Sequence, residues 1–534
     1  MNNEFIFFFT NNTKKNLKYI YSFFLGITLV ACFPPFNFWP LLFPSLTFIF
    51  LKSYNAESEK DAFLIGWFFG LSFFMFSLYW IFNSFLIRSG TYILLLPICL
   101  LSFSCFLALF ISFITYLNYK FKTNLIFNIT FFSIFWTFSE IFRGYLLTGF
   151  PWNLLAHTLS DFDALIQICS IIGAYGLTFF IIYFILALSI FILNFNKKRK
   201  YFLFLSSFFI FASIFFYGIN RLNNSNLNIY GSDVFRVVQP NINQIDKLNI
   251  SKIENNYKKL IDTSFNNKMG SLNKSDNLVI FWPETAIFNF NHIYDFNIFK
   301  KLNNNLKENE YVITGIFRNE DKDYYNSISI IDRNLSVDFV YDKIHLVPFG
   351  EYIPFSNFLN FFGFNFLGLK KGYKNQKIVE YKNLPKFKPL ICYESIFSGK
   401  FIKNKNEPVF LVNFTNDAWF GNTIGPYQHF VNSKFRAVEE GKHLIRVANT
   451  GISSSIDPFG RVLEKLTLNS SGYFDTKIFI GNKNNVPIKT IFSKYKNNLV
   501  IVLLIILFFL LSILKYQTHK GKKSNSKTNY LENK

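Results

Sequence analysis

One cysteine, Cys392, is unusual because it is the single thiol in the long polar part of the sequence. It ends an apolar run in the segment PLICYESIF, and a carboxylate follows two residues later at Glu394. The other four cysteines lie in or at the edges of long apolar runs, at Cys32, Cys99, Cys105 and Cys169. An unpaired thiol is either a small buried hydrophobe or a functional nucleophile, and Cys392 alone leaves both interpretations open.

Three other segments place reactive side chains at the ends of predicted strands. The apolar strand NLVIFWP leads into Glu284, and the segment VYDKIHLVPFGEY supplies the ammonium of Lys343 and the carboxylate of Glu351. A further buried-type strand, PVFLVNFTNDAWF at residues 408–420, also ends in polar residues. Functional groups in α/β folds lie where strands pass into loops. A single Glu or Lys at such a place is usually a solvated surface residue, but the combination predicts one shared site.

The chemistry that these residue types support is acyl transfer through a thioester. A free thiol has a pKa of about 8.5, so a base such as Glu284 must remove its proton at neutral pH. Attack of the Cys392 thiolate on an ester or amide carbonyl builds an oxyanion, which the Lys343 ammonium can stabilise. The same glutamate can then deprotonate the second substrate. His345 is an alternative base, although a local hydrogen-bonding role suits it better.

Long apolar runs make up much of the remaining chain. Hydrophobic residues form 51% of the sequence and aromatic residues 21%, which is too apolar for an ordinary soluble protein. A membrane-spanning helix takes about 20 residues, and we count eight candidate spans. They are residues 17–33, 36–51, 62–87, 92–117, 125–147, 164–195, 201–218 and 498–514. The run at 164–195 contains Gly173 and Gly176, so it is either one span or a span with a re-entrant segment.

The charge distribution indicates how the chain crosses the membrane. Lys and Arg outnumber Asp and Glu by 55 to 33, a net charge of +22, which could suggest a nucleic-acid partner. The basic residues instead gather at every second turn between apolar runs, near residues 14–18, 52–60, 120–122, 197–200 and 515–523. The positive-inside rule then places both termini in the cytoplasm and the polar domain on the far side of the membrane. We expect no nucleic-acid partner.

The three residues and their flanking segments resemble a known family. Glu284 in FWPETA, Lys343 in YDKIHLVPFGEYIP and Cys392 in ICYESIF are similar, in type, order and spacing, to the Glu-Lys-Cys triad of the nitrilase superfamily. Their surroundings resemble its membrane-embedded branch, the apolipoprotein N-acyltransferases. Further blocks are similar as well: Glu140 with RGYLLTGFPWN at 143–153, VVQPNI at 237–242, NFTNDAWFG at 413–421 and the stretch 428–451. Leu248 departs from the family, which commonly has an aromatic residue there.

The resemblance implies a mechanism and its partners. Cys392 would take an acyl chain from a phospholipid such as phosphatidylethanolamine and pass it to the α-amino group of a diacylglyceryl-cysteine at a lipoprotein N-terminus. Glu351 and Glu394 would be supporting carboxylates, and Tyr393 follows the nucleophile. No cofactor is implied, and the six histidines show no metal-ligand spacing. The aromatic run at 357–364 is either a membrane-dipping lid or an ordinary core segment.

The fold that follows is a polytopic α-helical membrane domain joined to an extracytoplasmic α/β domain with a nitrilase-like αββα sandwich. We expect the membrane domain at residues 1–225, the catalytic domain at 226–492, a last transmembrane helix at 493–516 and a basic cytoplasmic tail at 517–534. The protein would lie in a bacterial inner membrane, crossing it several times among the membrane lipids, with the catalytic domain on the periplasmic side.

Two other functions are compatible with the same residues. A membrane-anchored amidase of the nitrilase type would release its acyl group to water instead of to an amine. A non-catalytic transporter or scaffold would keep the fold without using Cys392, but transporters usually carry charged residues deep within several spans, and here such residues are sparse. The lipid-linked substrates that the resemblance implies favour the transferase.

Overall fold

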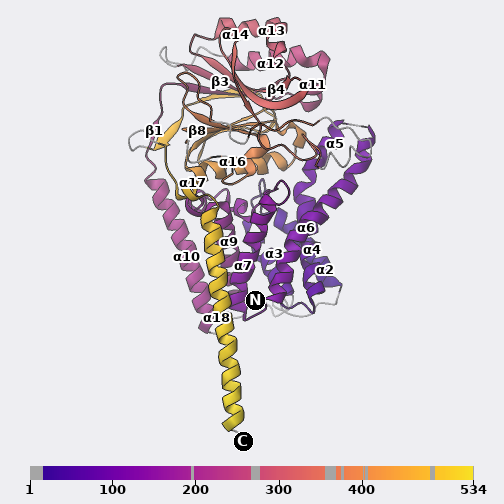
Figure 1. Ribbon diagram of the computed structural model, residues 1–534, viewed down its shortest axis with the longest axis vertical. Coiled ribbons are helices and arrows are strands. Elements are labelled where there is room, and N and C mark those ends of the chain that lie inside the picture. The colour runs from indigo at the N-terminus through magenta and orange to yellow at the C-terminus, as the bar shows by residue number, and fades with distance from the viewer. Residues whose placement is uncertain are drawn as a thin grey trace.

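A helical bundle and a β-rich domain are stacked end to end in the computed structural model (Figure 1). The structure describes residues 16–88, 90–193, 198–265, 277–354, 368–373, 378–400, 402, 407–481 and 487–532. The aromatic run at 357–364, considered above as a lid or a core segment, lies outside the described residues.

The bundle is built from the predicted apolar runs, and each of the eight runs overlaps a helix. These helices are α2 (Leu17–Val30), α3 (Leu42–Tyr54), α4 (Glu59–Leu78), α6 (Leu96–Lys120), α7 (Leu125–Tyr145), α9 (Cys169–Leu193), α10 (Lys198–Asn223) and α18 (Asn498–Glu532). Among the described residues, six helices are long and apolar enough to cross a membrane. The other two, α2 and α3, have 14 and 13 residues, fewer than the roughly 20 that a full crossing needs. The count of eight spans is therefore approximate.

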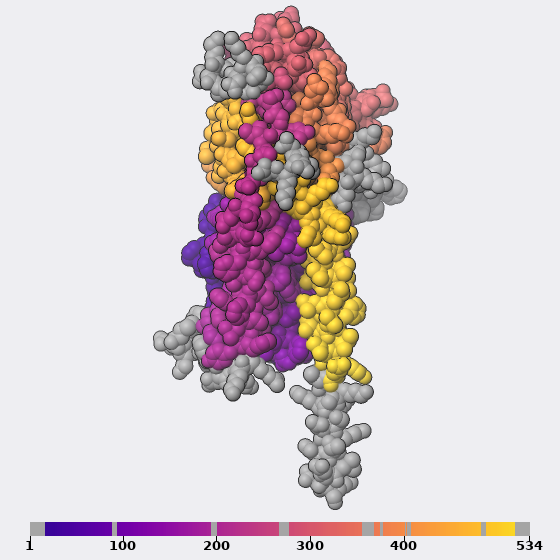
Figure 2. All heavy atoms as spheres, turned by 90° about the vertical axis from the view of Figure 1, so that its left-hand side faces the viewer, coloured from indigo at the N-terminus to yellow at the C-terminus, as the bar shows by residue number. Residues whose placement is uncertain are grey.

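The outer faces of the bundle are apolar. Helices α10 and α18 lie on the same side of it, where they expose large hydrophobic side chains (Figure 2). Examples are Phe202, Phe209 and Phe216 on α10 and Phe509 and Leu510 on α18, all more than half exposed. Such a surface is stable against lipid chains and unfavourable in water, so the helices form a membrane-embedded domain.

The run at 164–195, which the sequence left open, forms helical segments separated by a kink at Gly173. A short helix, α8 (Asp163–Ile166), precedes α9, and within α9 Gly173 has φ 68°, outside the helical region. The carboxylate of Glu439, from the β-rich domain, accepts a hydrogen bond from the Ala174 N–H at 2.9 Å. It satisfies a backbone donor that the break leaves free, as a helix cap does.

The β-rich domain contains two sheets within the described residues. One has the strand order β12-β2-β3-β4-β5-β6 and the other β11-β10-β9-β8-β7, with a small β1-β13 ladder beside them. The first sheet is built from β2 (Val234–Gln239), β3 (Leu278–Ile287), β4 (Tyr311–Glu320), β5 (Asp323–Ile331), β6 (Val337–Asp342) and β12 (Gly472–Thr476). The second is built from β7 (Phe387–Ile391), β8 (Phe410–Thr415), β9 (His443–Ala448), β10 (Ser453–Ile456) and β11 (Val462–Leu466), and β1 is Leu227–Ile229 and β13 Phe479–Gly481.

The two sheets pack face to face through aromatic side chains. The Phe281 ring of β3 lies 5.7 Å from that of Phe414 on β8, and the Phe235 ring of β2 lies 5.3 Å from that of Phe410. Helix α12 (Ile253–Phe265), with the short helices α13 (Asn291–Asp295) and α14 (Lys300–Asn305), covers the outer face of the first sheet. Helix α16 (Gly425–Glu440) covers the second sheet. The predicted αββα sandwich on a helical membrane domain is confirmed.

Helix α16 also joins the sandwich to the bundle, because it lies between the second sheet and the membrane helices (Figure 1). Gln428 near its start accepts hydrogen bonds from the indole N–H groups of Trp80 and Trp152, at 3.2 and 2.8 Å. Farther along, the Phe435 ring packs on His157. Helix α16 is thus both the outer layer of the sandwich and its contact with the membrane domain.

Candidate active site

The ammonium of Lys343, directly after β6, lies between the carboxylates of Glu284 and Glu351. Glu284 lies within β3, whereas the sequence predicted it past the end of that strand, and Glu351 lies in the loop that follows β6. Its Nζ is 3.3 Å from Glu284 Oε1 and 2.9 Å from Glu351 Oε1, and the side chain is 1% exposed. Burial alone would lower the pKa of Lys343, but the two carboxylates outweigh it and hold that pKa above its ordinary value. The lysine is therefore a permanent cation in this site.

Glu284 reaches the site because strand β3 bulges. Its pairing with β4 is interrupted between Trp282 and Ile287, and Thr285 within the bulge has φ 47°. The bulge passes so close to Gly315 of β4 that a Cβ on that glycine would lie 2.5 Å from the Glu284 Cα. The absence of a side chain at Gly315 therefore lets the bulge turn Glu284 toward Lys343.

Two residues that the sequence did not single out for this site support it: Asn326 contacts both carboxylates, and Lys247 holds the backbone of the β3 bulge. Asn326 of β5 donates from Nδ2 to Glu284 Oε1 at 2.8 Å and to Glu351 Oε1 at 2.9 Å. Lys247, buried on the other side of the bulge, donates to the Glu284 carbonyl oxygen at 3.0 Å and to Thr285 Oγ1 at 2.9 Å. Burial lowers the pKa of Lys247 to about 8, although Glu284 favours its charged form. For Asn326, the only signal that the sequence offered was a polar residue within a predicted strand, because such a residue needs hydrogen-bond partners if the strand is buried.

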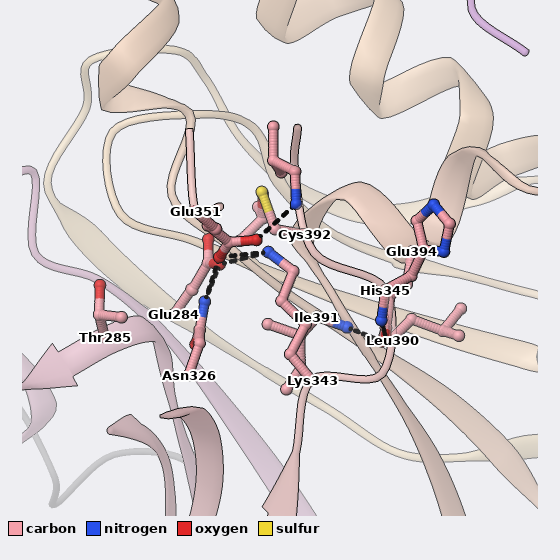
Figure 3. A network of polar contacts seen from close by, with 12 residues as sticks. Glu284, Thr285, Asn326, Lys343, His345, Glu351, Leu390, Ile391, Cys392 and Glu394 are labelled. Carbon is pink, nitrogen blue, oxygen red and sulfur yellow. Dashed lines mark hydrogen bonds and ion pairs between the residues drawn. The ribbon is translucent and has the colours of Figure 1, made fainter. Parts of the chain in front are cut away.

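Cys392 directly follows β7 and begins a short 3-10 turn, η7 (Cys392–Ile396), with φ 51°. Figure 3 shows its sulfur beside the carboxylates of Glu284 and Glu351 and the ammonium of Lys343. The Thr415 hydroxyl, at the end of the neighbouring parallel strand β8, donates to Sγ at 3.4 Å. Burial and the Glu284 charge raise the pKa of Cys392 above its ordinary value, while Lys343 opposes them. The thiol is thus protonated at rest, and an adjacent base is needed.

Glu394 holds the backbone around the nucleophile. One of its carboxylate oxygens accepts from the N–H groups of Ile344 and His345, at 2.8 and 3.0 Å, and the other accepts from Ile391 N at 2.8 Å. These bonds tie the loop that follows Lys343 to the end of β7. Burial raises the pKa of Glu394, while the backbone donors stabilise its charged form.

Tyr393 and His345 lie on the membrane-facing side of the turn. The Tyr393 hydroxyl donates to the carbonyl oxygen of Gly149, in the membrane domain, at 2.8 Å. The His345 ring stacks on Tyr393 and packs against Phe397, and it points away from the sulfur (Figure 3). Burial and nearby lysines lower the pKa of His345 to about 3. This geometry does not favour His345 as the base for Cys392.

A thiol, two carboxylates and a lysine gathered in one site of an αββα sandwich define a nitrilase-type domain, here carried on a membrane bundle. Comparisons with known proteins agree with this class. Residues 25–187 match the model of the apolipoprotein N-acyltransferase N-terminal domain, and residues 236–480 match that of carbon-nitrogen hydrolase.

Two of the similar proteins match most of the chain. Apolipoprotein N-acyltransferase of Rickettsia prowazekii is 36% identical, over 92% of this chain and 97% of that protein. The Rhodopseudomonas palustris apolipoprotein N-acyltransferase is 34% identical, over 83% of this chain and 86% of that protein. A carbon-nitrogen hydrolase superfamily structure from Xanthomonas campestris is 15% identical, covering 46% of this chain and 89% of that one with a TM-score of 0.32.

The chain belongs to the apolipoprotein N-acyltransferase family. It is a membrane-embedded acyltransferase that N-acylates lipoproteins with an acyl group taken from a lipid.

Proposed function

We propose that Cys392 carries the acyl group as a thioester, with Glu284 as its base and Lys343 as the stabiliser of the oxyanion. The observation that supports this most directly is the seating of Lys343 between two carboxylates beside the sulfur. Glu351 and Asn326 orient the charged groups, Glu394 fixes the nucleophile turn, and Tyr393 anchors that turn on the membrane domain. A phospholipid such as phosphatidylethanolamine is the acyl donor.

The first half-reaction forms the thioester. Glu284 takes the proton from Sγ while Sγ attacks the ester carbonyl carbon of the phospholipid, and Lys343 stabilises the negative charge that develops on the carbonyl oxygen. Collapse breaks the bond to the glycerol oxygen, which receives the proton from Glu284 and leaves as part of a lysophospholipid. The acyl chain then remains on Cys392.

The second half-reaction moves the acyl chain to nitrogen. The α-amino group of a diacylglyceryl-cysteine attacks the thioester carbonyl, again giving an oxyanion beside Lys343. Glu284 accepts a proton from the attacking amine and returns it to the departing Cys392 sulfur, so the enzyme regains its starting state. One carboxylate thus serves both steps.

The seating of the sandwich on the bundle supports transfer to a lipid-linked acceptor in preference to water. Both substrates are held in a membrane, and Tyr393, next to the nucleophile, is bonded to Gly149 of the membrane domain. Asn83, the first residue of the short helix α5 (Asn83–Arg88), likewise donates to the Trp419 carbonyl oxygen at 3.2 Å. An active site at the membrane surface meets both lipids by lateral diffusion, and apolar surroundings limit hydrolysis of the thioester.

Labelled phospholipid, added to the purified full-length protein with and without a diacylated cysteine peptide, tests transfer against hydrolysis. We expect labelled peptide and lysophospholipid in equal amounts, with little free fatty acid in either reaction. Thin-layer chromatography and mass spectrometry of the peptide would measure both products. Release of free fatty acid with an unmodified peptide would identify a hydrolase.

We also propose a bacterial inner-membrane location with the sandwich on the periplasmic side and both termini in the cytoplasm. Lys18 in the first turn of α2 pairs with Asp61 in the first turn of α4 at 2.8 Å, and Lys52 lies in the last turn of α3, so these basic residues lie at helix ends of the bundle. Cytoplasmic ends of membrane helices carry such residues. We place the division between the membrane and catalytic domains at residue 225, between α10 and β1.

The proposed orientation predicts the behaviour of reporter fusions. Alkaline phosphatase joined after residue 230 should be active, because that enzyme folds in the oxidising periplasm. Joined after residue 520, it should be inactive, while a fluorescent protein at the same place should be bright. The reverse pattern would place the catalytic domain in the cytoplasm.

A further inference from the structure

The backbone of Cys392 is held in an unusual conformation by polar side chains behind it. Its φ of 51° is in the left-handed region, which residues with a Cβ rarely adopt unless neighbouring groups hold them there. The Cys392 carbonyl oxygen lies 3.2 Å from His429 Nε2, and it accepts a hydrogen bond from Ser395 Oγ at 3.1 Å. Asn413 Nδ2 is a more distant donor at 3.4 Å. The peptide that sets the direction of the nucleophile therefore rests against His429.

The other nitrogen of His429 is bound to a buried carboxylate. Nδ1 lies 2.7 Å from Asp417 Oδ1, and Arg446 NH2 lies 2.7 Å from Asp417 Oδ2. All three side chains are at most 1% exposed. Burial would raise the pKa of Asp417, but Arg446 and His429 outweigh it and hold that pKa well below its ordinary value.

The Asp417 carboxylate can only accept, so a proton on Nδ1 of His429 satisfies the short contact between them. Arg446 NH2, which can only donate, also lies 3.1 Å from Nδ1 and satisfies the other tautomer. Nε2 is directed at the Ser395 hydroxyl, 3.2 Å away, and at the carbonyl oxygen of Cys392. With the ring proton on Nδ1 alone, Nε2 accepts from the Ser395 hydroxyl, which then no longer donates to the Cys392 carbonyl oxygen. With a proton on Nε2, the ring donates to that carbonyl oxygen directly. In both states the ring contacts the turn, through Ser395 or through the Cys392 carbonyl oxygen.

Aromatic side chains hold the imidazole from the membrane side. The Trp152 ring, from the loop after α7, lies 5.4 Å from the His429 ring, and the Phe420 ring lies 6.0 Å from it. The Trp152 indole N–H is itself fixed by Gln428, the residue before His429. His429 is thus held between the second sheet and the membrane domain.

We propose that His429, oriented by Asp417 and packed against Trp152, is a positioning residue that fixes the Cys392 turn and thereby aims the sulfur at the acyl carbonyl. This inference rests on the proposed role of Cys392 as the nucleophile. It assigns a task to the stretch 428–451 and to the tryptophan of the membrane-domain block, neither of which the triad explains. His429 itself does not touch the substrate.

Two amide substitutions test the contacts of the two His429 ring nitrogens separately. In His429→Gln the side-chain amide reaches the place of Nε2 and can still support the Cys392 turn, whereas in His429→Asn it reaches only the place of Nδ1 and keeps just the Asp417 contact. Intact-mass measurement of acyl-Cys392 at several phospholipid concentrations gives a maximal acylation rate and a half-saturating concentration. We expect His429→Asn to lower the maximal rate about 100-fold with unchanged half-saturation, and His429→Gln to recover most of it.

The matched control is His443→Gln, which alters another fully buried histidine, on β9 of the second sheet, that contacts Ser455 and not the nucleophile turn. It should leave the maximal rate unchanged. The inference would be overturned if both His429 variants lost maximal rate equally and in step with a fall in their melting temperatures. An unchanged maximal rate in His429→Asn would overturn it as well. If His429→Asn does not fold, Ser395→Ala replaces it, and an unchanged maximal rate in that variant would overturn the inference too.

These outcomes are distinct from failure of the proposed function. If Cys392→Ala still acylates the peptide, the nucleophile assignment is wrong, and with it the basis of this inference. If Cys392→Ala is inactive while His429→Asn acylates normally, the nucleophile assignment stands and only the positioning role fails.

Discussion

Replacement of Cys392 by alanine should abolish both the acyl adduct and N-acylation of a diacylated peptide. The variant lacks the atom that carries the acyl chain, and no other side chain of the described site is a nucleophile in position to replace it. We expect a loss of at least about 10³-fold in peptide acylation, comparable to removal of a nucleophile from other covalent enzymes. Mass spectrometry of the intact protein and of the peptide would measure the two losses separately.

Cys105→Ala is the matched control, since this partly buried cysteine lies on α6 in the membrane domain. It should retain the adduct, which hydroxylamine should remove as it removes other thioesters. Cys392→Ser tests the chemistry further, because a hydroxyl keeps the size of the side chain but ionises far less readily than a thiol. Undiminished turnover in Cys392→Ala would favour the scaffold or transporter alternative over catalysis at this site.

Replacement of Glu284 by glutamine should lower the acylation rate about 10²- to 10⁴-fold at neutral pH, the range expected for a general base. Glutamine keeps the shape and can still meet Asn326 and Lys343, but it cannot take the thiol proton. The adduct measured by intact mass at a fixed short time gives the rate. A rate within a few-fold of the wild type would exclude Glu284 as the base.

The Glu284→Gln substitution should also change how the acylation rate depends on pH. Burial raises the pKa of Cys392, so without its base the thiolate forms only as the pH rises. The Glu284 charge raises that pKa further, so its removal lowers the pKa but leaves the contribution of burial. The variant's rate should therefore increase with pH through the alkaline range, where the wild-type rate changes little. Glu254→Gln, an exposed residue on α12, is the control and should follow the wild-type profile.

The sequence indicated the catalytic strands well because their pattern is local. Apolar runs such as NLVIFW and PLICYE are short enough to be strands, and each ends in a polar group, which predicts where that group emerges. The parallel pairing of β7 with β8 then places Cys392 and Thr415 at neighbouring strand ends. Membrane helices were equally evident, but composition alone did not show that α2 and α3 are shorter than a full span.

Asn326 and His429 could not be assigned in the same way. Asn326 lies 42 residues from Glu284 and 25 from Glu351, and it meets both because β4 and β5 fold back beside β3. His429 lies 37 residues from Cys392 and reaches its carbonyl across the packing of α16 on the second sheet. No local sequence pattern predicts either contact, because each depends on how elements that are distant in sequence pack together.

By itself the amino-acid sequence determined that this chain enters a membrane, that it carries a polar α/β domain, and that a thiol and a lysine follow strands, whereas the glutamate expected after a strand lies within β3. Hydrophobic periodicity and side-chain chemistry act over a few residues, and they can be recognised along the chain. Only the tertiary structure decided which carboxylates flank the lysine, how the Cys392 backbone is held, and that the membrane domain packs directly behind it. Those relations arise from the packing of strands and helices that are distant in sequence, and close packing fixes them to within an ångström.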